Sequence, residues 1–346
     1  MIQFKHKHNF ENLQGTLLNK YRNNLPLIEL GVHPIIKKEI LGRPIITLKD
    51  DIEFMYNMGY DFVKIQPVIK FPDKEKIDRN ANDEYKNAPD RAWATEDTGV
   101  ITCWQDFEQY QWPKISEINY SKYEQVKNLL PDGMGVIGQY GDIFTLVWEL
   151  MGFETFAYAT FEQPELVEAI FDKVSALVIS MFENMVQFDS VGALWYSDDI
   201  AFAAGLMVDP DFLRKYFFPC LKKIGTFAKQ KNIPFIYHTD GKLWDVMDDI
   251  VDCGVTALHP IEPKSMDFWE TRDKYSKMLS FCGGIEVDTL ARGTELELKG
   301  LIKKYLDTIP GTCSWSIGSS NSIPDYVTVK NYLILLEMVH EYNNNL

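Results

Sequence analysis

The sequence has little cysteine and no closely spaced cysteine pairs. Its 346 residues include only Cys103, Cys220, Cys253, Cys282 and Cys313, and no C-x-x-C spacing occurs. A chain of this length can bury a large core and needs no disulfide bonds to fold. We therefore expect free thiols in a reducing cytoplasm, and neither a disulfide scaffold nor a cysteine-rich zinc site.

Long hydrophobic runs and an excess of positive charge are also missing. No stretch holds eighteen uncharged apolar residues, and the opening MIQFKHKHNF has no apolar segment after its basic residues, so we expect no export signal. Lys and Arg number 35 against 50 Asp and Glu, which gives a formal net charge of −15. Phosphate backbones and anionic lipids are repelled by such a chain, so we expect neither a nucleic acid nor a membrane as partner.

Two catalytic motifs are absent as well. The sequence contains no G-x-x-x-x-G-K-[ST], the glycine-rich loop that holds nucleotide phosphates in P-loop proteins. It also lacks G-x-S-x-G, the strained turn that presents a serine nucleophile. Nothing in these patterns indicates a nucleotide site or a serine hydrolase.

Short β-branched or aromatic runs alternate with longer helical patterns along the chain. Eight such runs occur, at residues 26–30, 62–67, 135–141, 193–199, 234–241, 257–263, 280–286 and 314–320. Strands separated by helices pair in parallel, and eight of them predict an α/β fold of the (β/α)8 TIM barrel type. We expect one domain over residues 1–346, with a polar and aromatic insertion after the second strand, residues 70–130, covering the C-terminal mouth.

Polar side chains stand at the ends of the predicted strands. In a barrel these ends converge on one mouth, where active sites lie. The residues that we predict to meet there are Glu29, Gln139, Tyr140, Asp198, Asp199, His238, Asp240, His259, Glu262, Glu286, Ser319 and Asn321. Trp93 and Trp104, in the insertion, are predicted to wall a flat, apolar substrate, although loop packing explains them as well.

His238 and Asp240 are two apart on one strand, so both can point into the mouth. A neighbouring carboxylate favours the protonated ring and acid chemistry, whereas metal ligation needs the neutral ring, and the sequence leaves both readings open. In the alternative, purely structural interpretation, Asp240 caps the next helix. Asp198 and Asp199 face opposite ways on a strand, so we expect one of them in the pocket and the other bracing a loop.

Several blocks resemble the uroporphyrinogen decarboxylase superfamily. They are GQYGDIFTLVWELMGFE, LWYSDDIAFAAGLMVDPDFLRKYFFPCLKKI, IYHTDGKLWDVMDDIVDCGVTALHPIEPKSMD, CGGIEVDTLARGT and GSSNSIP, in this order over residues 130–340. The resemblance implies a (β/α)8 barrel and either decarboxylation or methyl transfer involving a corrinoid protein or a thiol. In the thiol-methylating branch an H-x-C motif and a further cysteine bind zinc, but His238, Asp240 and Asn321 stand at those positions here.

The opening NLPLIELGVHPIIKKEILGRPI resembles decarboxylase-like proteins of corrinoid methyl transfer, and the arginine-containing block of true uroporphyrinogen decarboxylases is missing. We therefore expect a methyltransferase that moves a methyl group from a small methylated compound, such as a methoxylated aromatic, to a separate corrinoid protein. We assign catalysis to His238, Asp240, Asp199 and Glu262, and substrate contacts to the other strand-end residues. A metal such as zinc on His238 and Asp240, and a homodimer, are left open. The alternatives are decarboxylation of a porphyrinogen or small acid, and a non-catalytic binding barrel.

Overall fold

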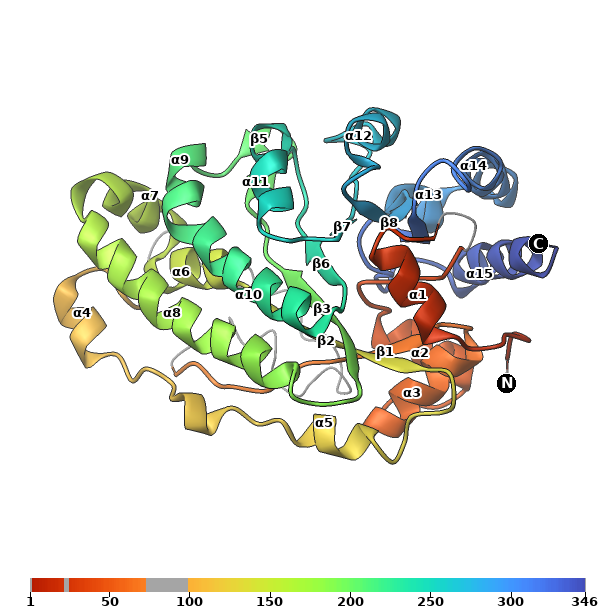
Figure 1. Ribbon diagram of the computed structural model, residues 1–346, viewed down its shortest axis with the longest axis horizontal. Helices are drawn as coiled ribbons and strands as arrows, with labels where there is room; N and C mark the ends of the chain where they lie inside the picture. The colour runs from red at the N-terminus through yellow and green to blue at the C-terminus, as the bar shows by residue number, and fades with distance from the viewer. Residues whose placement is uncertain (1, 22–24, 73–98, 346) are drawn as a thin grey trace.

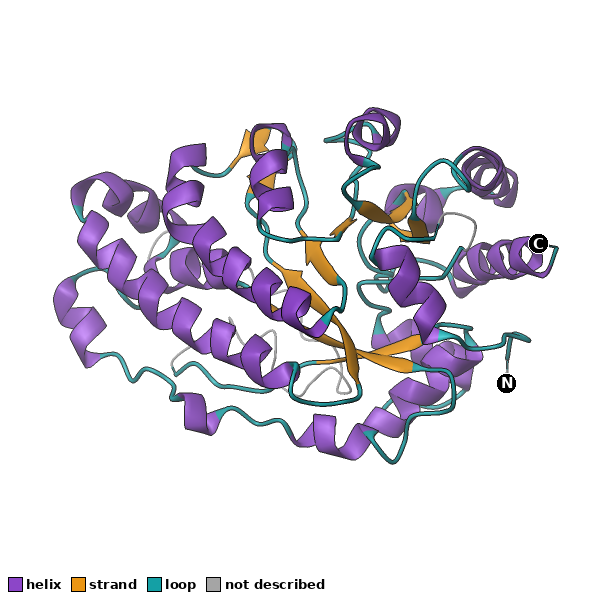
Figure 2. Ribbon diagram, viewed as in Figure 1, coloured by secondary structure: helices purple, strands orange, loops and turns teal. Residues whose placement is uncertain are grey.

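The computed structural model describes residues 2–21, 25–72 and 99–345. Seven parallel strands form one sheet in the order β1-β2-β3-β6-β7-β8-β9. They are β1 (Phe62–Ile65), β2 (Gly135–Gly141), β3 (Val191–Ser197), β6 (Phe235–His238), β7 (Ala257–His259), β8 (Ser280–Ile285) and β9 (Trp315–Ser319). The sheet curls through the interior, and helices surround it (Figure 2).

The helices lie along the outside of the curled sheet (Figure 1). They are α1 (Phe10–Leu17), α2 (Pro34–Leu41), α3 (Leu48–Asn57), α4 (Trp104–Gln109), α5 (Ser121–Val126), α6 (Ile143–Met151), α7 (Phe153–Glu162), α8 (Pro164–Met185), α9 (Pro210–Phe212), α10 (Phe218–Lys231), α11 (Met247–Asp252), α12 (Phe268–Tyr275), α13 (Val287–Arg292), α14 (Glu295–Thr308) and α15 (Val329–Asn344). A small antiparallel hairpin, β4 (Ala201–Phe202) and β5 (Gly205–Leu206), follows β3.

Seven of the eight predicted runs each overlap one of the sheet strands, and all six pairings between neighbours are parallel. The first run, residues 26–30, lies beside β9 through an isolated parallel bridge between Leu27 and Ile317. Its backbone bonds to that strand run from Ile28 N to Ile317 O and from Ile317 N to Pro26 O, both at 2.9 Å. The α/β fold and the parallel sheet are thus confirmed as a TIM-barrel-like arrangement.

Local sequence signals explain where the helices begin. The Thr47 hydroxyl accepts a hydrogen bond from Asp50 N, and the Asp50 carboxylate accepts one from Thr47 N, so a capping box starts α3. At α9, the Asp209 carboxylate accepts a hydrogen bond from Asp211 N at 2.8 Å, and Pro210 occupies the first helical turn. Both helices therefore begin at side-chain caps that can be recognised in the sequence.

The predicted insertion, residues 70–130, is described only in part. Trp93 lies outside the described residues. The rest includes α4 and α5 and a packed aromatic cluster, in which Phe107 lies 5.5 Å from Trp104 and Trp112 between ring centroids. The Trp104 side chain remains 45% exposed. Coverage of the mouth by this segment therefore stays a prediction. Within the described residues, no helix is both long and apolar enough to cross a membrane.

Candidate active site

Three predicted catalytic residues come together at the carboxyl ends of β3 and β6. One ligand atom from each of Asp199, His238 and Asp240 lies within 4.8 Å of the other two. The Nε2 atom of His238 is 3.9 Å from Asp199 Oδ1. The same oxygen accepts a hydrogen bond from the backbone N–H of Asp240 at 2.9 Å. Asp199 thus joins the two strand ends, and we call Asp199, His238 and Asp240 the acidic triad.

One carboxyl oxygen of Asp240 has a hydrogen-bond partner and the other has none. Its Oδ2 accepts a hydrogen bond from Asn321 Nδ2 at 2.7 Å, whereas its Oδ1 is buried and has no hydrogen-bond partner. Burial, together with the nearby charges of Asp199 and Glu262, raises the pKa of Asp240 to about 8. The side chain therefore holds a proton at neutral pH unless a cation replaces it.

His238 faces the interior and contacts a second histidine. Its Nδ1 lies 2.7 Å from Nδ1 of His259, which is fully buried at the end of the neighbouring strand β7. Burial lowers the pKa of His238 to about 4 and that of His259 well below its usual value. Both rings are therefore neutral at pH 7. The Nε2 atom of His259 is buried without a partner, and its ring centroid lies 5.0 Å from that of Trp195.

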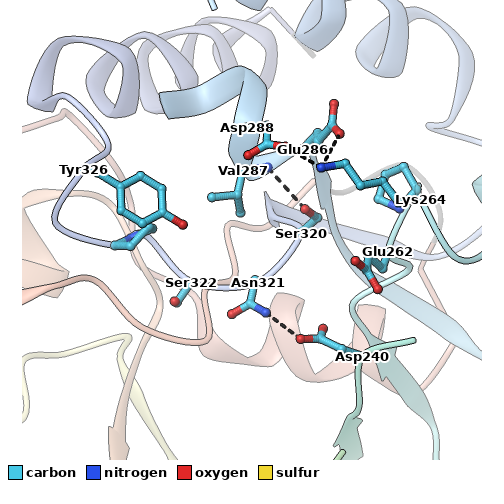
Figure 3. A pocket seen from close by; sticks show the side chains of 12 residues that line it. Asp240, Glu262, Lys264, Glu286, Val287, Asp288, Ser320, Asn321, Ser322 and Tyr326 are labelled. Atoms are coloured by element: carbon cyan, nitrogen blue, oxygen red, sulfur yellow. Dashed lines mark hydrogen bonds and ion pairs between the residues drawn. The ribbon is translucent and has the colours of Figure 1, made fainter. Parts of the chain in front are cut away.

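A cavity of about 220 Å³ opens beside Asp240 (Figure 3). It is lined by Asp240, Glu262, Pro263, Lys264, Glu286, Val287, Asp288, Ser320, Asn321, Ser322, Pro324 and Tyr326. Glu262 is fixed there, because its Oε2 accepts hydrogen bonds from Gly241 N at 3.1 Å and Ser265 Oγ at 2.7 Å. Three predicted strand ends, those of β6, β7 and β8, thus contribute acids to one cavity, and Asn321 follows β9.

The wall of this cavity is acidic. Asp240, Glu262, Glu286 and Asp288 face one cation, Lys264. The ammonium group of Lys264 pairs with Asp288 and lies 3.9 Å from Glu286 Oε1, as the dashed lines in Figure 3 show. Its charge is thus already directed at two carboxylates. A polyanionic ligand would meet repulsion in this cavity.

Glu29 and Ser319 form a further pair at the first predicted strand and β9. The Glu29 carboxylate accepts hydrogen bonds from Ser319 N at 3.1 Å and from the Ser319 hydroxyl. Burial raises the pKa of Glu29 to about 8. Between β2 and β3, Gln139 Nε2 donates to Ser197 Oγ at 3.5 Å. None of these four residues lines the acidic cavity.

Two predicted substrate contacts lie elsewhere. Asp198 accepts hydrogen bonds from Phe144 N at 2.6 Å, from Thr145 N at 3.0 Å and from the Thr145 and Tyr196 hydroxyls at 2.7 and 2.6 Å. It therefore braces the start of α6, which is the role expected for one member of the aspartate pair. Tyr140 is paired in register with Tyr196, whose ring packs 5.9 Å from Phe182 of α8. Tyr140 thus shares the face that turns toward the helices.

Sequence reasoning overlooked Lys64 and Trp195 in the interior. The ammonium group of Lys64 donates to the carbonyl oxygen of Leu30 and lies 4.7 Å from the Trp195 ring centroid. Its positive charge also contributes to the lowered pKa values of His238 and His259. The signal in the sequence was a lysine inside the apolar run 62–67, because a charged residue in a buried strand costs free energy unless it has a partner.

The acidic triad offers one imidazole nitrogen and two carboxylates. Catalytic zinc sites commonly use three protein ligands of these kinds and leave a position open for a substrate or water. The unpartnered Oδ1 of Asp240 and the neutral His238 ring fit such an ion. The triad contains no thiolate, so the donor set suits a harder metal than the cysteine-containing zinc sites of the thiol-methylating branch.

Comparisons with known proteins agree with this architecture. The structure is similar to a methyltransferase from Methanosarcina mazei, with a TM-score of 0.66 and 17% identity, over 97% of this chain and 99% of that one. The match to a xylose isomerase-like TIM barrel protein from Mycobacterium smegmatis covers 65% of this chain and 80% of that one, with 14% identity. Its TM-score of 0.36 is too low to carry an argument. No curated protein matches the sequence.

At 17% identity, the likeness to the Methanosarcina protein establishes the fold alone. The sequence itself matches the model of one family, described as uroporphyrinogen decarboxylase (URO-D), over residues 99–342. This match includes the acidic triad and most of the sheet strands. The chain belongs to the uroporphyrinogen decarboxylase family.

Proposed function

We propose that the protein is the substrate-binding methyltransferase of a corrinoid-dependent demethylation. It takes a small methylated compound, such as a methoxylated aromatic, and delivers the methyl group to a separate corrinoid protein. The observation that carries this proposal is the acidic triad, Asp199, His238 and Asp240, placed beside an open cavity at the carboxyl ends of the strands. The fold shared with a methyltransferase from Methanosarcina mazei supports it.

Breaking the bond between a methyl group and an oxygen or nitrogen leaves a poor anion unless a proton or Lewis acid reaches the leaving atom. Asp240 is suited to this task, because its Oδ1 is unpartnered and Asn321 holds the other oxygen. When the methyl group departs, the leaving atom takes the Asp240 proton, and solvent later returns one. Asp199 fixes the Asp240 backbone, and Glu262 fixes the turn at Gly241.

Two bound groups would add to this chemistry. A corrinoid on its partner protein supplies the nucleophile that accepts the methyl group. A divalent metal held by Asp199, His238 and Asp240 would supply the Lewis acid in place of the Asp240 proton. His238 can serve this metal because burial keeps its ring neutral. Trp93 and Trp104 remain our proposed wall for an aromatic substrate.

Decarboxylation of a porphyrinogen is the weaker candidate, because of the charge on the cavity wall. Such substrates carry several carboxylates, and besides the protonated Asp240 the cavity presents three acids against one lysine that is already paired. Repulsion at these distances opposes binding. A small acid in a protonated or paired form would meet less repulsion.

The test is a substrate panel with purified full-length protein and a reduced corrinoid protein. Methoxybenzoates, methylamines and uroporphyrinogen are incubated separately, and products are separated by chromatography. We expect a demethylated phenol or amine in amounts that follow the corrinoid supplied. Coproporphyrinogen formed without corrinoid protein would overturn the proposal in favour of decarboxylation.

A further inference from the structure

A second cluster of metal-binding side chains lies far from the acidic cavity in the fold. The N-terminal strap, residues 2–9, runs without helix or strand before α1. Along it, His6 and His8 are half-buried whereas Lys5 and Lys7 are exposed, which is the alternation of an extended chain lying on a surface. Both histidines turn toward Asp61, which directly precedes β1. This is the amino end of a strand, opposite to the carboxyl ends that carry the acidic triad.

The three side chains converge on one oxygen. His6 Nε2 lies 2.7 Å and His8 Nδ1 lies 3.6 Å from Asp61 Oδ1. One ligand atom from each residue lies within 4.8 Å of the other two. The backbone N–H of Asn9 also donates to Asp61 Oδ1, at 2.9 Å, so the carboxylate is held in place between the strap and the start of β1.

These separations match a small metal ion. Zinc binds imidazole nitrogen and carboxylate oxygen at about 2.0–2.2 Å in tetrahedral geometry, which places neighbouring ligand atoms about 3.3 Å apart. The distances of 2.7 and 3.6 Å lie on either side of that value. These two separations would each change by well under 1 Å when an ion enters. The His8 Nδ1–H group donates to the backbone carbonyl of Tyr60 at 3.1 Å, and an ion bound at Nδ1 would replace this hydrogen bond.

Neighbouring rings already fix the two histidines. The His8 ring stacks on Tyr56, with 4.1 Å between centroids, and the edge of His6 meets His8 at 4.8 Å. On the other side of His6 lies His340 of α15, 5.5 Å away between centroids. His340 in turn stacks on Phe4 at 4.6 Å. Ligands restrained in this way lose little side-chain freedom when an ion binds.

We propose that His6, His8 and Asp61 form a structural site for a divalent transition metal of the zinc type. The ion would fasten the N-terminal strap to the chain entering β1, beside the C-terminal helix α15. Two imidazole nitrogens and one carboxylate suit Zn²⁺, Co²⁺ or Ni²⁺ better than Mg²⁺ or Ca²⁺, which prefer oxygen ligands alone. The inference does not depend on the proposed function, because the strap and the acidic triad share no residue.

The test uses the full-length chain, stripped of metal, in a His238→Asn background that disables the acidic triad. Titration with Co²⁺ is followed by visible absorbance and by the change in Tm. We expect one tightly bound equivalent with tetrahedral absorption bands and a higher Tm. Adding His6→Gln and His8→Gln should weaken binding roughly tenfold or more, a loss of about 1.4 kcal/mol or more.

Two further variants keep the result interpretable. Asp61→Asn retains an oxygen for the Asn9 N–H but removes the ligand charge, so it should weaken Co²⁺ binding without unfolding the strap. His33→Asn changes a histidine at the N-cap of α2 and should leave binding unchanged. The proposal is overturned if the His238→Asn protein binds no Co²⁺, or if the His6, His8 and Asp61 variants bind it as tightly as that protein does.

Discussion

The Nδ1 atoms of His238 and His259 lie 2.7 Å apart, so only one of them can carry the proton between them. When His259 donates, His238 presents an Nε2–H group toward Asp199. When His238 donates, its Nε2 lone pair faces the acidic triad and is ready for a cation. His259 therefore sets which form of His238 meets the cavity, in the way that partners of metal-bound histidines commonly do.

Replacing His259 should slow catalysis without changing substrate binding. We expect His259→Phe to lower kcat about 10–100-fold with KM nearly unchanged, because the His238 ring loses its hydrogen-bonding partner. His259→Asn, which keeps a polar partner, should recover part of the loss. Steady-state demethylation kinetics measure both variants, with Tm as a control for folding. Wild-type kcat in a folded His259→Phe protein would contradict this positioning role.

Glu29 should make the protein less stable as the pH rises. Its pKa is raised by burial from 4.5 to about 8, so the folded state holds this proton more tightly than the unfolded state does. Stability due to the protonated form is present at low pH and is lost as the pH rises from about 4.5 to about 8. Glu29→Gln should remove this loss. Urea unfolding at pH 5, 7 and 9 measures it, with Glu286→Gln as the control.

An unchanged pH slope in Glu29→Gln would show that Glu29 is ionised in the folded protein. Its pairing with Ser319 would then be a carboxylate bound by two donors, and another group would cause any loss at high pH. A slope reduced in Glu29→Gln but kept in Glu286→Gln is the result that we predict, because Asp240, whose pKa is also raised, still contributes to the slope.

Asp198 should stabilise the folded protein, because it accepts hydrogen bonds from the start of α6. Asp198→Ala leaves the N–H groups of Phe144 and Thr145 and two hydroxyls without their acceptor. Each buried donor left unpaired costs about 1–3 kcal/mol, so we expect a loss of about 3 kcal/mol or more in the free energy of unfolding. Chemical denaturation tests this, with exposed Asp189→Ala as the control. A loss below about 1 kcal/mol, the net effect of a single hydrogen bond, would contradict it.

Much of the fold could be predicted from the sequence because short apolar runs between helical patterns indicate parallel strands. The run 135–141 matches β2 to the residue. The run 26–30 looks the same by composition, yet it makes only an isolated bridge to β9. Pairing depends on how a segment meets its neighbours, which composition does not reveal.

The site was predictable in its members but less so in its contacts. Alternation along a strand implied different surroundings for Asp198 and Asp199, and the structure places the half-exposed Asp199 beside His238 while the buried Asp198 contacts Tyr196. Alternation alone could not say which of the two would be buried. The His238–His259 contact follows from the register of β6 on β7, where the two residues are partners. Register is set by tertiary packing, so the sequence predicted neither the contact between His238 and His259 nor the cluster of His6, His8 and Asp61.

The central claim is that the acidic triad activates the leaving group of a methylated substrate. The most direct measurement is the single-turnover rate of demethylation by Asp240→Asn, with enzyme in excess over the methylated substrate and with reduced corrinoid protein. We predict a rate about 10²–10⁴-fold below wild type, since the proton or metal ligand at the leaving atom is lost. The exposed Asp245→Asn, five residues along the chain, should keep the wild-type rate. A wild-type rate in Asp240→Asn would contradict the account.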